Sequence, residues 1–130
     1  MSIEINKSFK FIVYGEPASK ANSRRIVKFG KRMAVIKSEK ARNYEKNFAQ
    51  QCPTLKNLIE NDVKVELIIY YASRRPDLDE SVILDCMQGK IYANDRQVKE
   101  KIVYWGLDRD TPRTHIRVSP LETRDLPSDF

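Results

Sequence analysis

The sequence predicts a single α+β domain with a mixed β-sheet of about five to six strands and two main helices. The chain has 130 residues, of which 41% are hydrophobic, which is enough to bury one ordinary core. Apolar residues alternate with a period of two in several segments, and they recur at helical spacing in two others. We therefore expect residues 1–130 to form one domain, with a polar tail at about 122–130.

The first part of the chain predicts three strands followed by a helix. Residues 10–15 form the first expected strand. Residues 24–29 and 32–37 are β-branched and alternating, and a glycine separates them, so they predict a hairpin with a strongly basic tip. Ser38 is the expected N-cap of an amphipathic helix over residues 39–52, which the following proline ends.

The second part predicts a central strand, a short helix and two more strands. Residues 62–72 alternate first and then become continuously apolar, which is typical of a strand in the middle of a sheet. A helix is expected over about residues 79–88, and Gly89 ends it. Residues 97–107 and 114–122 are the last two expected strands.

Composition excludes several classes of protein. No apolar run approaches the roughly 20 residues that cross a bilayer, and the first residues lack a signal peptide's apolar middle, so we expect a cytoplasmic protein without membrane contact. With only Cys52, Cys86 and the single His115, a zinc site of several Cys and His ligands is excluded. A Ser-His-Asp triad would need that one histidine, and no nucleophile-elbow motif accompanies it. No small-molecule cofactor is expected.

Positive charge is concentrated in the first part of the chain. The net charge is +6, yet residues 1–50 carry 12 Lys/Arg against 4 Asp/Glu, whereas residues 51–130 carry 12 against 14. Residues 20–37 hold seven basic residues and no acidic one, and such a one-sign run favours a polyanion as partner. The candidate DNA-binding residues are Lys20, Arg24, Arg25, Lys28, Lys31, Arg32, Arg74 and Arg75.

Two aspartates follow the central strand, and each has a structural and a chemical interpretation. Asp77 precedes Glu80 by three residues, as in a capping box, and Asp79 could equally cap the helix. A third carboxylate, Asp95, can return to the same place, because the helix rises about 15 Å and the six residues after it span up to about 20 Å. Its structural interpretation is a turn residue beside Asn94.

A metal site is the chemical interpretation. Three aspartates around one point repel each other unless a cation lies among them, and oxygen ligands alone suit Mg²⁺, with Mn²⁺ as a substitute. We therefore name Asp77, Asp79 and Asp95 as candidate catalytic and metal-binding residues of a phosphodiester hydrolase. The PD-(D/E)xK nuclease pattern fits poorly, because its second part occurs only at residues 62–64, upstream of Asp77.

Four motifs resemble one known family. Residues 74–80 (RRPDLDE), 84–89 (LDCMQG) and 92–98 (YANDRQV), together with the basic loop at 15–25 (GEPASKANSRR), resemble the RusA-type Holliday junction resolvases, particularly phage-encoded members. The resemblance runs from about residue 10 to residue 118. It implies a homodimeric, Mg²⁺-dependent endonuclease that binds four-way DNA junctions and makes paired nicks in opposing strands.

The resemblance also assigns residues. It places the family's catalytic aspartates at Asp77, Asp79 and Asp95, and Asn94 stands where some members have a further aspartate. Some members carry a lysine on the helix. Here that position falls on a residue without positive charge, either Ile83 or Ser81 depending on the alignment. The cation that would stabilise developing negative charge is then sought elsewhere, and the open candidates are Lys90, Arg96, Arg74 and Lys20.

Two rival functions fit part of the sequence. One is a junction-binding or duplex-binding protein whose nuclease site has decayed, which the missing helix lysine favours. The other is a small basic assembly protein that binds nucleic acid and uses the aspartates only as helix caps and turns. Substitution of the aspartates distinguishes them, because a cap costs stability whereas a metal ligand costs cleavage.

Overall fold

The centre of the fold is strand β4 (Val63–Tyr71). The structure is a computed structural model that describes residues 8–19, 22–74, 77–121 and 126–130. Its odd-numbered residues are fully buried and its even-numbered residues are partly exposed. This period of two follows from the pleat of a strand, which turns successive side chains to opposite faces. The predicted central strand is therefore confirmed.

Four strands form the main sheet, in the order β1-β6-β4-β5. Strand β1 (Phe9–Tyr14) pairs antiparallel with β6 (Arg113–Pro120), and β6 pairs antiparallel with β4. Strand β5 (Val98–Leu107) pairs parallel with β4, so the sheet is mixed. A parallel neighbour requires a crossover, and the segment between these two strands supplies it.

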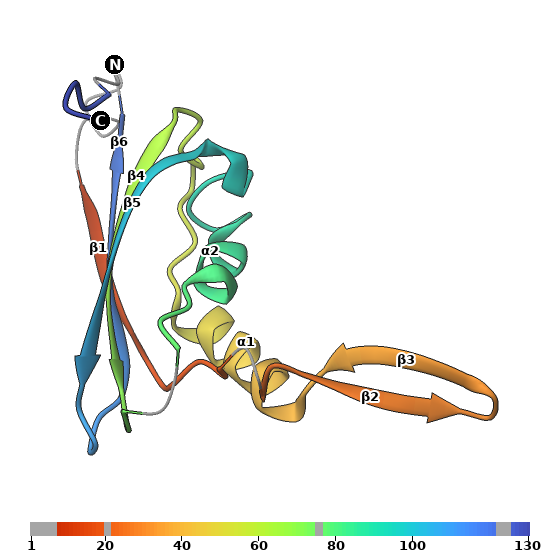
Figure 1. The fold of residues 1–130 in the computed structure, drawn as a ribbon. Helices are drawn as coiled ribbons and strands as arrows, with labels where there is room; N and C mark the ends of the chain where they lie inside the picture. Colours follow the sequence, from red (N-terminus) through yellow and green to blue (C-terminus); the bar gives the residue numbers. More distant parts are fainter. Residues whose placement is uncertain (1–7, 20–21, 75–76, 122–125) are drawn as a thin grey trace.

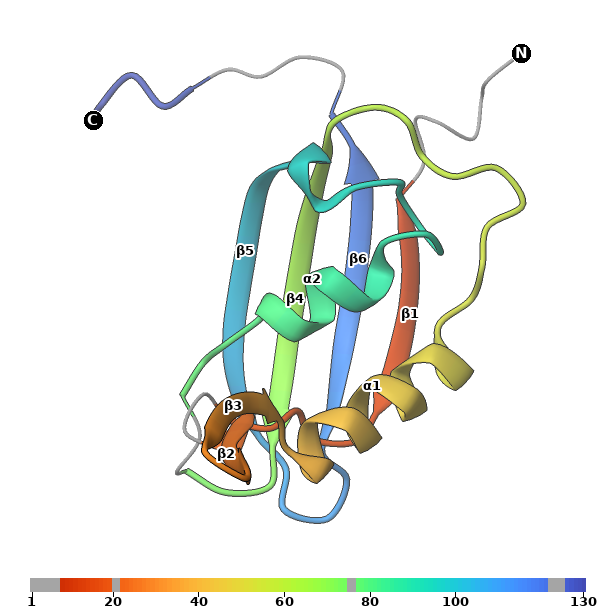
Figure 2. The ribbon, with the colours of Figure 1, turned by 90° about the vertical axis from the view of Figure 1, so that its right-hand side faces the viewer.

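The helices cover one face of this sheet (Figure 2). Helix α1 (Glu39–Gln51) buries Phe48 against the sheet, and α2 (Ser81–Met87) buries Ile83 and Met87. A 3₁₀ helix, η3 (Asp95–Gln97), precedes β5. Figure 1 shows the resulting two layers, and within the described residues no helix covers the opposite face of the sheet.

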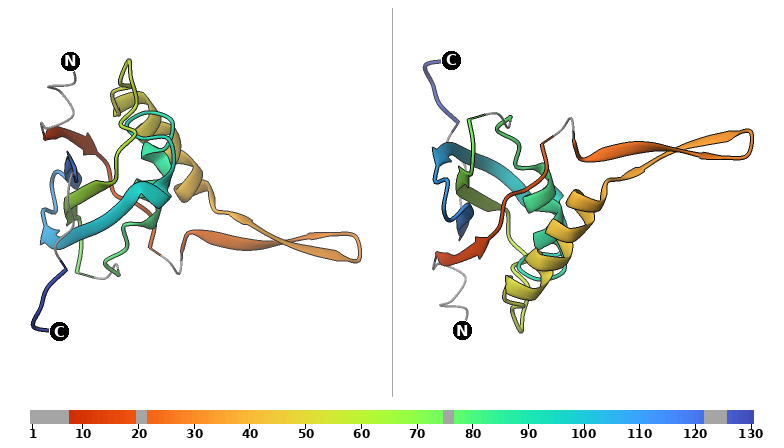
Figure 3. Two further views of the ribbon diagram at one scale, coloured as in Figure 1. Left: turned by 90° about the horizontal axis from the view of Figure 1, so that it is seen from above. Right: turned by 90° about the horizontal axis from the view of Figure 1, so that it is seen from below.

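A two-stranded arm projects from this body (Figures 1 and 3). It consists of β2 (Arg24–Phe29) and β3 (Arg32–Lys37), which pair only with each other. The turn between them contains Gly30 at φ 60°, a left-handed conformation that glycine adopts without steric cost. The arm carries basic residues and also exposed apolar ones, including Ile26 at 65% and Met33 at 70% exposure.

The predicted α+β class with six strands and two helices is confirmed for the described chain. The six strands are divided, because the hairpin forms the arm instead of joining the main sheet. The second helix begins at Ser81, two residues later than expected, and Gly89 lies beyond its end with φ 80°. Within the part of the chain that the structure describes, no helix is long and apolar enough to cross a membrane.

The start of α1 offers a direct test of the local structure. The Ser38 hydroxyl accepts a hydrogen bond from the backbone N–H of Ala41 at 3.1 Å, as predicted for an N-cap. We expect Ser38→Ala to lower the free energy of unfolding by about 1 kcal/mol, because that N–H loses its partner. Thermal denaturation measures the loss. Ser38→Thr keeps a hydroxyl, and an equal loss in that variant would contradict the capping role.

Candidate active site

The loop after β4 is held in place by a buried tyrosine. Tyr71, 1% exposed, is the last residue of β4, and its ring stacks on Trp105. Its hydroxyl donates a hydrogen bond to the backbone carbonyl of Asp77 at 2.9 Å and accepts one from the N–H of Asp79 at 3.3 Å. One rigid side chain therefore fixes the backbone that carries both aspartates.

Asp79 stabilises the start of α2 from the position before its N-cap, which is Glu80. Its Oδ1 accepts hydrogen bonds from the backbone N–H of Ser81 at 3.1 Å and from the Ser81 hydroxyl at 2.8 Å. The capping box proposed for Asp77 and Glu80 is absent: no side chain caps α2 at Glu80, and its carboxylate binds Lys101 on β5 instead. Only one oxygen of Asp79 is used in this way, so capping and chemistry remain compatible at this residue.

Helix α2 presents one further carboxylate on the same side as Ser81. Because α2 begins at Ser81, Asp85 lies four residues later, one helical turn along the same face. Ile83 points the other way and is fully buried in the core. Of the two alternative helix positions, Ser81 lines the cavity beside Asp79 and Ile83 does not.

Asp79 and Asp85 line a common cavity of about 90 Å³ at the base of the arm. Arg24 and Lys37, from the two arm strands, line the same cavity. The Lys37 ammonium lies 2.7 Å from the carboxylate of Glu45 on α1, which orients it. The cavity thus brings carboxylates and cations together from three separate segments of the chain.

Asp95 lies beside Asp85. Its backbone N–H donates to the side-chain oxygen of Gln88 at 2.9 Å, which ties the start of η3 to the end of α2. Asn94 caps η3 together with Gln97, so the turn does not use the Asp95 carboxylate. Burial and the neighbouring Asp95 raise the pKa of Asp85, which is the behaviour of two carboxylates forced together.

The three predicted aspartates do not form one cluster. Asp79 and Asp85 share the cavity at the start of α2, whereas Asp95 meets Asp85 at the side of η3. Asp77 is exposed at the edge of the loop. Across residues 8–19, 22–74, 77–121 and 126–130, no three Asp, Glu, His or Cys side chains are grouped to hold a metal ion. The chain brings Asp95 beside Asp85, and the assignment of Asp77, Asp79 and Asp95 as metal ligands stays a prediction.

Most of the predicted DNA-binding residues lie on or near the arm. Arg24 borders the cavity, and Arg25, Lys28, Lys31 and Arg32 are exposed farther along the arm. Arg74 is exposed in the loop after β4. Lys20 and Arg75 lie outside the described residues.

Among the residues considered as a replacement for the helix lysine, Lys90 does not line the cavity. Lys90 donates to the backbone carbonyl of Ala49 at 3.2 Å, near the end of α1. Arg96 is exposed on η3, next to Asp95 in the chain. Lys37 lies with Asp79 in the cavity and was not among the candidates.

The sequence matches the family described as Endodeoxyribonuclease RusA over residues 15–119. The chain belongs to the RusA family.

The match to the RusA family includes every element of the site. It begins at the loop after β1, contains the arm and both helices, and ends in β6. RusA membership identifies this chain as an endodeoxyribonuclease, an enzyme that cuts within DNA strands. The carboxylates and basic residues that adjoin each other here are the groups that phosphodiester hydrolysis requires.

Sequence reasoning missed three residues of this candidate site: Asp85, Lys37 and Tyr71. Asp85 was visible as the fourth residue after Ser81, but the expected helix began too early to show their shared face. Lys37 belongs to a basic strand in the sequence, and only the fold around the cavity at the base of the arm brings it to the carboxylates. Tyr71 gave no signal, because a tyrosine ending a strand usually serves the core.

Proposed function

We propose that this protein is a Mg²⁺-dependent, homodimeric endonuclease that resolves four-way DNA junctions by paired nicks. The observation that supports this most directly is the cavity in which Asp79 and Asp85 lie with Arg24 and Lys37 at the base of a basic arm. A DNA phosphate guided by the arm would arrive where carboxylates and cations already adjoin. Family membership supports the same class of reaction.

Asp85 and Asp95 are the residues that best fit a divalent cation. Burial and the neighbouring Asp95 raise the pKa of Asp85, and two carboxylates so close together gain most when a cation separates them. Mg²⁺ needs only one or two carboxylates, since water and phosphate oxygens complete its shell, and Mn²⁺ can substitute. When bound, the metal would supply an activated water and offset charge on the leaving oxygen. Asp79 and Asp77 would border the same phosphate from the loop.

The chain's own cations have a separate role. Lys37 and Arg24 would bind the non-bridging oxygens of the phosphate and hold it against the carboxylates. Glu45 would keep Lys37 in that position through the ion pair already present. These contacts replace the positive charge that a buried Ile83 cannot provide.

Lys37 is a sharp test of this arrangement. We expect Lys37→Met to lower the cleavage rate by about tenfold to 100-fold, because one preorganised cation near the developing charge is lost. Single-turnover cleavage of a labelled junction measures the rate, and Lys37→Arg should recover most of it. Glu45→Gln breaks the same ion pair and keeps the lysine. A loss in Glu45→Gln as large as in Lys37→Met would assign the effect to packing of the arm.

The function as a whole is tested with a labelled four-way junction and a matched linear duplex. We expect symmetric nicks in the junction alone, in Mg²⁺ or Mn²⁺ and not in EDTA. Cleavage of the linear duplex at the same rate would overturn the junction preference. Tight junction binding without cutting in either metal would support the decayed, binding-only alternative.

A further inference from the structure

A second basic region lies beside Asp95, at the start of β5. A pocket of about 220 Å³ is lined there by Asp95, by α2 and by the first residues of β5, which include Lys99 and Lys101. Figure 2 shows the start of β5 on one side of α2 and the arm on the other. Asp85 lines the cavity at the base of the arm and adjoins Asp95. This pair of carboxylates therefore lies between the cations of the arm and a second pair of lysines.

An irregularity in β5 places these lysines. Val98 pairs with Val63 on β4, but the next pair joins Glu100 to Lys64, so Lys99 is one extra residue in β5. Such a β-bulge leaves its extra residue unpaired and changes the face to which the following side chains point. Bulges are common next to active sites, where they redirect a side chain.

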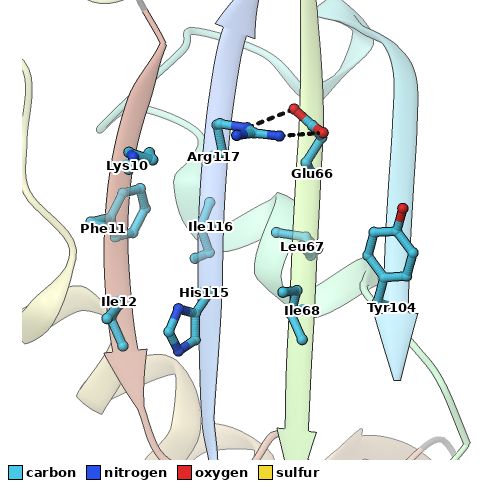
Figure 4. A pocket seen from close by; sticks show the side chains of 10 residues that line it. All are labelled: Lys10, Phe11, Ile12, Glu66, Leu67, Ile68, Tyr104, His115, Ile116 and Arg117. Carbon is cyan, nitrogen blue, oxygen red and sulfur yellow. Dashed lines mark hydrogen bonds and ion pairs between the residues drawn. The ribbon is translucent and has the colours of Figure 1, made fainter. Parts of the chain in front are cut away.

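The faces of β5 beyond the bulge follow from its register with β4. Tyr104 pairs with Ile68, and both line a hollow on the face of the sheet that the helices leave open (Figure 4). Because side chains alternate along a strand, Glu100 belongs to the same open face. Its carboxylate lies there 3.5 Å from Lys64 Nζ, which keeps this negative charge paired on the open face.

Lys101 lies on the opposite face, which the helices cover. Its register partner is Val65, which is fully buried in the core. Without the extra residue, the register would put Glu100 opposite Val65 and add another carboxylate on the side of Asp95. The bulge therefore exchanges a negative charge for a positive one at this place.

The two lysines differ in how they are held. Lys101 forms an ion pair with Glu80, directly before α2, just as Lys37 is held by Glu45 at the base of the arm. Lys99 is exposed and makes no ion pair with any residue that the structure describes. One ammonium is thus oriented by the protein, and the other is available to an anion from solution.

We propose that Lys99 and Lys101 form a phosphate site that holds the DNA phosphate next to the one that is cut. The site deepens the proposed function and rests on it, because it takes the cut phosphate to lie at Asp85 and Asp95. A DNA strand that crosses α2 then has one phosphate at the carboxylates and its neighbour at the two lysines. Two consecutive contacts fix the direction and the register of the strand, which a single contact leaves free.

The experiment removes the charge of single phosphates. Four-way junctions that each carry one neutral methylphosphonate linkage, at successive positions around the branch point, are bound to the full chain in EDTA. At one position we expect the neutral linkage to lower wild-type affinity by about tenfold, because a charge-assisted contact is lost. Lys99→Ala with Lys101→Ala should bind the unmodified junction about tenfold more weakly, and the neutral linkage should cost this variant less than about twofold more.

Two control variants keep the effect specific. Lys99→Arg with Lys101→Arg preserves both charges and should retain most of the response to the neutral linkage. Lys46→Ala with Lys56→Ala removes two exposed lysines from α1 and the loop after it, and this variant should respond like the wild type. Circular dichroism checks that all variants are folded. If the alanine variant at β5 also loses about tenfold at every position to which the wild type responds, the lysines do not bind a phosphate and the proposal fails.

Cleavage of the same junctions in Mg²⁺ separates this site from the proposed function. The mapped nick should lie at the phosphate next to the position that depends on the two lysines. A dependent position several nucleotides from the nick would overturn the proposal and leave the nuclease intact. A wild type that shows the dependent position but cuts no junction would overturn the proposed function and leave the phosphate site intact.

Discussion

Replacing Asp95 by Asn should lower the rate of junction cleavage by at least about 100-fold and leave junction binding equal or tighter. Loss of groups that merely support a metal ligand already costs about 10-fold to 100-fold, so loss of a proposed ligand should cost more. Binding should not suffer, because removing a negative charge reduces repulsion of the DNA phosphates. Single-turnover cleavage and an equilibrium binding assay at one salt concentration measure the two effects separately.

The same substitution at Asp85 and Asp79 shows which carboxylates belong to the site. Asp85→Asn should behave like Asp95→Asn, because the two side chains adjoin. Asp79→Asn is informative for another reason: its amide keeps an oxygen that can accept from Ser81, so the cap survives while the charge is lost. Its unfolding free energy should change by less than about 1 kcal/mol.

The control for charge alone is Glu60→Gln, which removes one exposed carboxylate from the loop before β4. It should cut junctions at the wild-type rate. If Asp85→Asn and Asp95→Asn also cut at that rate, the pair is not the metal site. If only Asp79→Asn is inactive, cleavage depends on the cavity at the base of the arm and does not need Asp95 on η3.

Removing two charges from the arm should weaken junction binding and flatten its dependence on salt. Lys28 and Lys31 are exposed at the turn between β2 and β3. Figure 3 shows that the arm extends away from the main sheet. Each phosphate contact contributes about 0.9 to the slope of log K against log salt concentration. Lys28→Ala with Lys31→Ala should therefore reduce the slope by about 2 and lower affinity by at least about tenfold at moderate salt.

The matched control removes two exposed lysines from other surfaces, Lys46 on α1 and Lys56 in the loop after α1. Its salt dependence should stay within about 0.5 of the wild-type slope. An unchanged slope in the arm variant would exclude the arm as a phosphate contact. A slope change without loss of affinity would mean that other contacts replace the arm, which also contradicts its proposed role.

The sequence predicted the elements of this fold well because their signals are local. The alternation in β4, the Ser38 cap and the turn at Gly30 each depend on a few neighbouring residues. The separation of the hairpin from the main sheet was not predictable in this way. It depends on which strands find partners across the chain, and β1 pairs with β6 instead of with β2.

The sequence predicted where the site residues lie along the chain better than it predicted which of them are in contact. Asp79 follows the central strand as expected, but the carboxylate that shares its cavity is Asp85. The predicted helix began two residues too early, and this concealed that Asp85 lies on the same face as Ser81. Chain length allowed Asp95 to reach either end of α2, since a span of about 20 Å sets only an upper limit. The hydrogen bond from the Asp95 N–H to the Gln88 side chain ties Asp95 to the end of α2. A single contact of this kind leaves no pattern in the sequence that could predict it.

The pairing of β1 with β6 has a consequence for synthesis of the chain. About 100 residues separate the two strands, and at about 5–20 residues per second the ribosome needs on the order of 5–20 s to make them. During that interval β1 has no partner in the main sheet, and its apolar Phe9 and Phe11 have only part of their final contacts. Completion of the four-stranded sheet must therefore wait for β6, although β4 and β5 can pair before it. A ribosome stalled before β6 would hold an incomplete domain exposed to chaperones and proteases.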